Sequence, residues 1–134
     1  MFKISLLALA LVSLASCGGD SSSDDYQMAI DQAAAKQAEA IALAPASPCS
    51  AVQQCSALSF VEPMGHCTSQ RFQAYSLATP TADAASAAAA DERALAIHAV
   101  ALAPPPVTAC AQVISGPPSL ACVASTCQAV APAN

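Results

Sequence analysis

The chain has 134 residues, enough for one domain, and carries a formal net charge of −5. Its few basic residues exclude the positive surface of a nucleic-acid binder and the polybasic patch that attracts anionic lipids. Alanine is about a quarter of the chain and Trp is absent, so large apolar side chains are few. Such a core is thin against the chain entropy it must offset, and we expect covalent cross-links to stabilise the fold.

Residues 1–16 have the pattern of an export signal. Lys3 provides a basic start, an apolar run extends from Ile4 to Leu14, and small residues follow it. The run is shorter than the roughly 20 residues that a membrane-spanning helix needs. We therefore predict a cleaved signal peptide rather than a transmembrane segment.

The next feature is the sequence Leu14-Ala15-Ser16-Cys17, which resembles the lipobox of bacterial lipoproteins. The resemblance implies cleavage before Cys17, with a diacylglycerol on its thiol and an acyl group on its amine. Gly18 stands where Asp retains a lipoprotein in the inner membrane, so the resemblance favours the outer membrane. The alternative is an ordinary signal peptide cut near Ala15, with Cys17 incidental.

Residues 17–25 contain only Gly, Ser and Asp after the cysteine and predict a lipidated flexible tether. Residues 26–48 then predict an Ala-rich helix that Pro45 and Pro48 terminate. We expect Ser23, Asp24 or Asp25 to cap this helix, because each side chain accepts hydrogen bonds from backbone N–H groups. Its expected apolar face is narrow: Tyr26, Ile30, Ala33, Ala34 and Ile41. A stalk is the favoured interpretation and a partner-binding helix the alternative.

Residues 49–128 form the predicted Cys-rich domain. Strands are expected at 57–61 and 71–77 around a Pro63-Met64-Gly65 turn, and again at 107–114 and 120–123. Between the two strand pairs, a second helix is expected to run to Ala103, with Thr79 as its cap and Pro80 in its first turn. The spacing predicts a packing face on this helix with Leu95, His98 and Leu102, widened by Ile97 and Val100. Residues 129–134 are expected to be a disordered tail.

Lipidation of Cys17 leaves six cysteines, an even number that predicts three disulfides in an exported domain. They are Cys49, Cys55, Cys67, Cys110, Cys122 and Cys127. The expected pairs are two local bridges, Cys55–Cys67 and Cys110–Cys122, with Cys49–Cys127 closing the domain. A metal site is disfavoured because the sequence has no Cys-x-x-Cys pair. A faint internal repeat of cysteine and proline spacing suggests two halves, each a helix followed by two strands; coincidence is the alternative.

Catalytic side chains are sparse. Glu62 and His66 flank the expected turn and are the one acid and histidine pair close in sequence within the Cys-rich domain. No nucleophile pattern or phosphate-binding loop accompanies them, so two solvated loop residues are the favoured interpretation. His98 is expected to be a half-buried packing residue. We predict no cofactor, and enzyme activity is the least favoured class.

The cysteine block resembles small exported proteobacterial proteins of no assigned function. The resemblance rests on Cys49-x5-Cys55, Cys67, Tyr75-Ser76, a helical spacer, and then Cys110, Pro118, Cys122 and Cys127. The chain departs from them at Thr68-Ser69-Gln70, where those proteins have Gly-Gly-Pro. The resemblance implies a disulfide-bonded periplasmic domain.

Together these features predict an α+β domain with two Ala-rich helices and a small antiparallel sheet, stapled by disulfides. The expected protein is a lipoprotein of the outer membrane that faces the periplasm or the cell surface. It would act as a non-enzymatic interaction or structural module, with the membrane and an envelope protein as partners. The alternative is an inhibitor of an envelope-active hydrolase, in which the Glu62–His66 loop enters an enzyme cleft.

Overall fold

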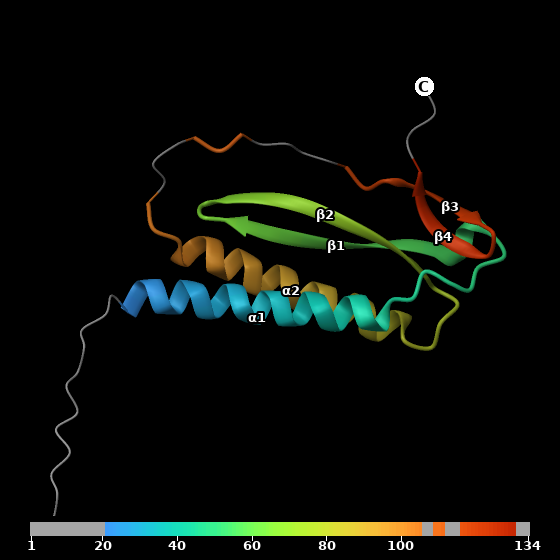
Figure 1. The fold of residues 1–134 in the computed structure, drawn as a ribbon, viewed down its shortest axis with the longest axis horizontal. Coiled ribbons are helices and arrows are strands. Elements are labelled where there is room, and N and C mark those ends of the chain that lie inside the picture. The colour runs from blue at the N-terminus through green and yellow to red at the C-terminus, as the bar shows by residue number, and fades with distance from the viewer. Residues whose placement is uncertain (1–20, 106–108, 112–115, 131–134) are drawn as a thin grey trace, which may run out of the picture.

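The computed structural model describes residues 21–105, 109–111 and 116–130, and these form the small α+β domain that the sequence predicts (Figure 1). The leader, Cys17 and residues 131–134 lie outside the described residues. The elements in order are α1 (Ser21–Leu43), η1 (Val52–Gln54), β1 (Cys55–Met64), β2 (Cys67–Ser76), α2 (Ala82–Leu102), β3 (Ser119–Val123) and β4 (Thr126–Val130).

The two helices lie side by side and antiparallel (Figure 1), with Tyr26 near the start of α1 beside Leu102 at the end of α2. Their contact is made mainly by small residues: Ala29, Ala33, Ala40 and Ala44 on α1 and just after it, and Ala82, Ala85, Ala88, Ala89, Ala96 and Ala99 on α2. The expectation of a stalk is therefore wrong, because α1 is packed along the domain. The predicted faces are wrong in part. Ala33 is buried and Leu95 packs against the core, but Ala34 and Ile97 are exposed, and the large residues flank a seam of alanines that lets the helices approach closely.

Helix boundaries differ from the prediction at both starts. α1 begins at Ser21, so residues 21–25 are helical and not part of a tether. α2 begins at Ala82, and the Thr79 hydroxyl donates to the Ser76 carbonyl oxygen at 3.1 Å instead of capping the helix. The segment between β2 and α2 is therefore a turn that this hydrogen bond closes.

Strands β1 and β2 form a long antiparallel hairpin with a two-residue loop, Gly65-His66. Both strands are longer than expected, since Met64 still pairs with Cys67. Gly65 has φ +64° at the first loop position, which is typical of a type II′ hairpin turn. A glycine is needed there because side-chain-bearing residues disfavour positive φ.

The core lies between this hairpin and the helix pair. Leu58, Phe60 and Tyr75 are buried against the alanines of both helices, and Phe60 has no exposed surface. Val61 is buried beside them, Ile41 packs against the cluster, and most of the remaining buried residues are alanines. The small core predicted from composition is confirmed.

Strands β3 and β4 form a second antiparallel hairpin beside the start of β1 and the end of β2 (Figure 1). Its two-residue loop is Ala124-Ser125, both with positive φ, as a type I′ turn requires. The expected tail is partly wrong, since β4 extends through Val130. The expected strand at 107–114 falls partly outside the described residues, and residues 109–111 are not in a strand.

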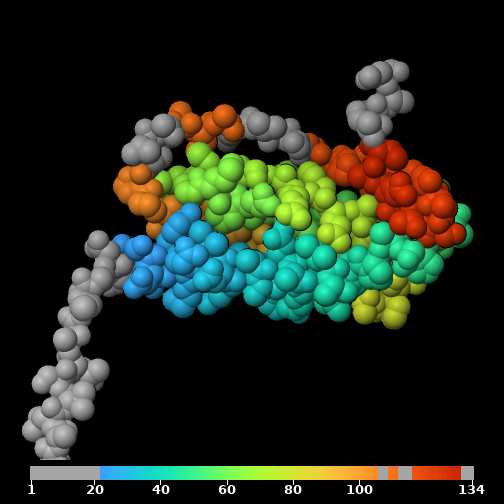
Figure 2. All heavy atoms as spheres, in the orientation of Figure 1, coloured from blue at the N-terminus to red at the C-terminus, as the bar shows by residue number. Residues whose placement is uncertain are grey.

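The order of elements repeats as helix and hairpin, then helix and hairpin. This agrees with the two halves that the cysteine and proline spacing suggests. The cysteines do not occupy equivalent positions in the two halves. Cys55 and Cys67 begin the two strands of the first hairpin, whereas Cys110 precedes the second hairpin. Figure 2 shows the start of α1 at one end of the molecule and the β3–β4 hairpin at the opposite end.

Candidate functional site

The six predicted disulfide cysteines all pair, but not as predicted. The bridges are Cys49–Cys122, Cys55–Cys127 and Cys67–Cys110. Each bridge joins a cysteine of the first helix–hairpin half to one of the second. The predicted local pairing is therefore wrong, although the disulfide framework itself is confirmed.

Register explains why the local bridge Cys55–Cys67 does not form. Cys55 pairs with Ser76 at the open end of the first hairpin, whereas Cys67 pairs with Met64 at its tip. Ten-residue strands separate those positions by about 30 Å, far beyond the reach of a disulfide. The short sequence separation of the two cysteines was a misleading guide to their distance in space.

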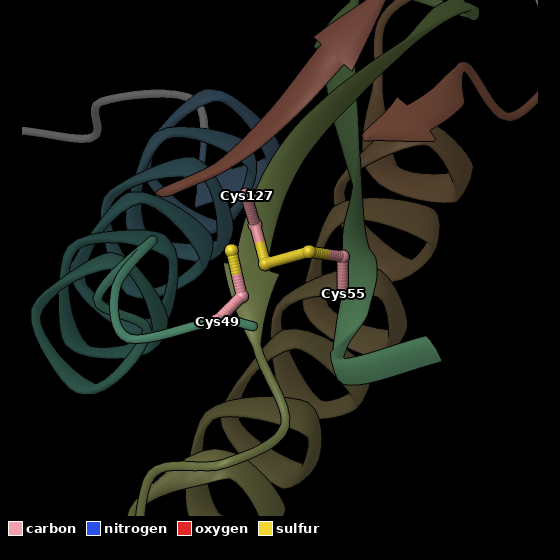
Figure 3. Close-up of side chains that lie close together, drawn as sticks. All are labelled: Cys49, Cys55 and Cys127. Carbon is pink, nitrogen blue, oxygen red and sulfur yellow. A yellow bond between two sulfur atoms is a disulfide. The ribbon is translucent and has the colours of Figure 1, made fainter. Parts of the chain in front are cut away.

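A cluster of sulfur atoms lies at the end of the molecule that carries β3 and β4. The Sγ atoms of Cys49, Cys55 and Cys127 lie within 4.8 Å of one another, a spacing that would suit a metal ion (Figure 3). All three sulfurs belong to disulfides, and a metal needs the thiolate form of cysteine. In this oxidised state the cluster is a buried pair of cross-links.

The acid and histidine singled out in the sequence have different surroundings near the tip of the first hairpin. The Glu62 carboxylate accepts hydrogen bonds from Arg71 at 3.0 Å and from the Ser69 hydroxyl at 3.4 Å. The buried Nε2 of His66 has no hydrogen-bond partner among the described residues. The described contacts therefore assign Glu62 to an ion pair across the hairpin and do not join it to His66.

The tip itself is fixed at two points. The Gly65 N–H donates to the Tyr26 hydroxyl of α1 at 3.2 Å, and the adjacent Cys67 is bonded to Cys110. Met64 projects there with 56% of its surface exposed. Met64 is thus an exposed apolar side chain at the tip of a hairpin that is held by a hydrogen bond and a disulfide.

Sequence reasoning missed a pair of charged residues that fastens α2 to the edge of β1. Both oxygens of the Glu92 carboxylate lie 3.3 Å from the Val61 backbone N, and Arg93 donates to the Ser59 carbonyl oxygen at 3.1 Å. These two backbone groups point away from β2, so the helix supplies the partners that an edge strand otherwise lacks. A Glu-Arg pair inside an alanine-rich helix was the signal available in the sequence.

Glu92 is buried, with 2% of its surface exposed. Burial raises the pKa of its carboxyl group above the ordinary value; the Val61 N–H and the Arg93 charge act in the opposite direction, and Glu62 adds a smaller increase. The shift follows from the cost of desolvating a charge. With its described contact made to backbone, Glu92 serves the packing of α2 on β1.

Two shallow hollows lie where α1 and α2 meet at their paired ends. One, of about 250 Å³, is lined by Asp25, Met28, Ala29, Gln32, His98 and Leu102. His98 is exposed, so its predicted half-buried packing role is wrong. The other, of about 580 Å³, is lined by Ser22, Ser23, Tyr26, Gln27, Leu102, Ala103, Pro104 and Pro105.

No helix in the described part of the chain is long and apolar enough to cross a bilayer. The predicted lipidation residue, Cys17, lies outside the described residues, four positions before α1 begins. Comparison of the chain with protein-family models, with curated proteins and with solved structures finds no match.

Proposed function

We propose that the chain is an exported lipoprotein, anchored through acyl chains on Cys17, whose folded domain is a non-enzymatic interaction or structural module of the cell envelope. The observation that carries the proposal is the set of three disulfides, which fits an oxidising compartment outside the cytosol. The lipobox-like sequence before Cys17 independently predicts the same destination. Gly18 after the cysteine supports the outer membrane.

The arrangement of side chains supports a binding or structural role over catalysis. Glu62 is engaged by Arg71 and Ser69, and Glu92 is engaged by the backbone of β1. A general acid or base needs to reach a substrate proton within hydrogen-bond distance. Glu92 is buried away from any substrate, and Glu62, although about half exposed, is paired with Arg71 at the surface.

Intact-mass analysis of the protein extracted from membranes tests the anchoring. We expect a chain that begins at Cys17 and is heavier than the bare polypeptide by a diacylglycerol and one acyl group. A matched Cys17→Ser variant should lose this added mass and leave the membrane fraction. An unmodified chain cut near Ala15 would overturn the proposal.

Affinity capture from envelope extracts tests the module. The anchored protein is compared with the Cys17→Ala form, and crosslinks to a defined envelope protein are expected only where the domain is held at the membrane. Absence of an enriched partner would remove the support for an interaction role.

A second candidate is an inhibitor of an envelope hydrolase, and the observation that favours it is the fixed hairpin tip with Met64 exposed. A rigid loop loses little entropy on entering an enzyme cleft. This candidate predicts that a soluble form inhibits a protease or lysozyme and that Met64→Arg abolishes the inhibition. Equal inhibition by both forms would exclude the tip as the inhibitory element.

A further inference from the structure

The orientation of the molecule relative to the membrane follows from where α1 begins. Cys17 is separated from Ser21 by four Cα–Cα steps, which span at most about 14 Å even when fully extended. The chain therefore has no long tether between the proposed lipid anchor and the folded domain. The first turn of α1 must lie close to the lipid head groups whenever Cys17 is anchored.

Two other segments lie at the same end of the molecule. The end of α2 and the residues after it, Leu102 to Pro105, line a hollow together with Tyr26. The tip of the first hairpin reaches the same tyrosine through the Gly65 N–H. We call this end, formed by the start of α1, the end of α2 and the hairpin tip, the anchor end.

The anchor end combines an uncharged hollow with an acidic helix start, because Asp24 and Asp25 are exposed at the beginning of α1, and this composition suits a zwitterionic phospholipid surface better than an anionic one. The residues that line its hollow are apolar or uncharged, and Met64 is exposed beside it. Tyr26 adds a phenol ring, a group that favours the boundary between lipid and water. Farther along the helices, contact with lipid would desolvate the ion pairs of Lys36.

From this placement we infer that the anchor end rests on the phospholipid surface and that the end carrying the β3–β4 hairpin points away from it. The inference rests on the proposed lipid anchor. α1 is about 33 Å long, so the β3–β4 hairpin and the Cys49–Cys122 bridge are carried that far from the bilayer. An envelope partner would then meet the end that carries the β3–β4 hairpin, and the tip of the first hairpin would not be free to enter an enzyme cleft.

The absence of Trp in the chain allows a direct test. Two full-length lipidated variants each receive one Trp at an exposed site: Met64→Trp at the anchor end, and Leu77→Trp at the opposite end. The parent residues are 56% and 48% exposed, so the probes are matched for accessibility. Each protein is reconstituted in phosphatidylcholine vesicles that contain a lipid with a nitroxide quencher on its head group.

We expect the Trp at position 64 to lose more than half of its emission to the quencher and the Trp at position 77 to remain unquenched. Pro105→Trp is a second anchor-end probe in case the hairpin variant does not fold. Equal quenching at both ends would mean that the domain lies flat, and quenching at position 77 alone would mean that it is inverted; either result overturns the inference.

Intact mass and vesicle flotation of the same samples separate this inference from the proposed function. A lipidated protein that floats with vesicles but shows no quenching at position 64 retains the anchor and overturns the orientation. A protein without lipid on Cys17 removes the anchor and, with it, the basis of the orientation. A Gly/Ser spacer of twenty or so residues inserted after Gly19 should release the Trp at position 64, because a flexible linker of that length reaches roughly 25 Å. Quenching that survives the spacer would overturn the role of tether length.

Discussion

Replacement of Glu92 tests how α2 is fastened to the edge of β1. Its carboxylate is buried, and both oxygens lie 3.3 Å from the Val61 N. Glu92→Ala leaves that N–H group buried without an acceptor, whereas Glu92→Gln keeps a carbonyl oxygen and removes the charge. The two variants therefore separate the hydrogen bond from the ionisation.

The expected magnitude follows from the contact. A buried donor left without a partner costs about 1–3 kcal/mol. We expect Glu92→Ala to lower the free energy of unfolding by about that much at neutral pH, and Glu92→Gln to lower it less. Asp91→Asn is the matched control, because Asp91 is exposed and makes only a 3.9 Å ion pair with Lys36.

The dependence on pH has a definite sign. Because burial raises the pKa of Glu92 in the folded chain, the folded state holds its proton more tightly than the unfolded state, where the carboxyl keeps its ordinary value near 4.5. The protonated Glu92 carboxyl group therefore contributes to the stability of the folded state below pH 4.5, and this contribution is lost as the pH rises through the raised pKa. The advantage of wild type over Glu92→Gln should shrink as the pH rises from 4.5 toward neutrality.

Urea unfolding followed by far-ultraviolet circular dichroism measures both effects, since the chain lacks Trp. The measurement is made on wild type and the three variants between pH 4 and neutrality, and carboxylates common to all cancel in the differences. If Glu92→Ala is as stable as the Asp91→Asn control, the hydrogen bond to Val61 does not hold the edge of β1. If the stability of wild type and Glu92→Gln changes in parallel with pH, the pKa of Glu92 is not raised.

Three further substitutions test the rest of the framework. The unreduced Cys67→Ala variant should carry one free thiol, which alkylation and peptide mapping should locate at Cys110; alkylation at another cysteine would refute the pairing. The variant should also be about 3–4 kcal/mol less stable, because a 43-residue loop is no longer closed. Replacing Ala124-Ser125 by Asn-Gly should raise the stability by about 1 kcal/mol, measured as a higher urea midpoint, because both positions have positive φ; a fall would contradict the turn type. Tyr26→Phe should cost about 0.5–1.5 kcal/mol through loss of the acceptor for the hairpin tip, and an unchanged urea midpoint would mean that the tip is not fastened there.

The sequence allowed the elements to be placed better than their contacts. Proline and glycine positions located the helices and the first turn, because these residues restrict the backbone wherever they stand. The packing faces were wrong in part, because the prediction gave most weight to Ile and Leu. In an antiparallel pair of alanine-rich helices, the close seam excludes large side chains, which remain half-buried beside it, as Leu95 does.

The contacts of the candidate site were also harder to predict, because they are made across strands and between separate elements. Local spacing singled out Glu62 and His66 and favoured two solvated loop residues, but it did not show the partners of Glu62: the cross-strand register places Ser69 directly opposite Glu62 and Arg71 two residues further along β2. The role of Glu92 depends on a free strand edge that exists only after β1 meets α2. Contacts between distant segments are fixed by the tertiary fold, and one sequence carries little direct record of them.

The disulfide pattern has a physical logic that ties the fold to its compartment. β3 and β4 are short, and Cys127 is the one buried residue in their two strands; the others are exposed or half-buried. A two-stranded hairpin of this size is marginal in water by itself. Cys49–Cys122 and Cys55–Cys127 bind it covalently to the first half, while Cys67–Cys110 closes the anchor end. The helices and first hairpin have an apolar core of their own, so reduction should release the second hairpin before it unfolds that core. The end proposed to face a partner is therefore the part whose structure depends most on an oxidising environment.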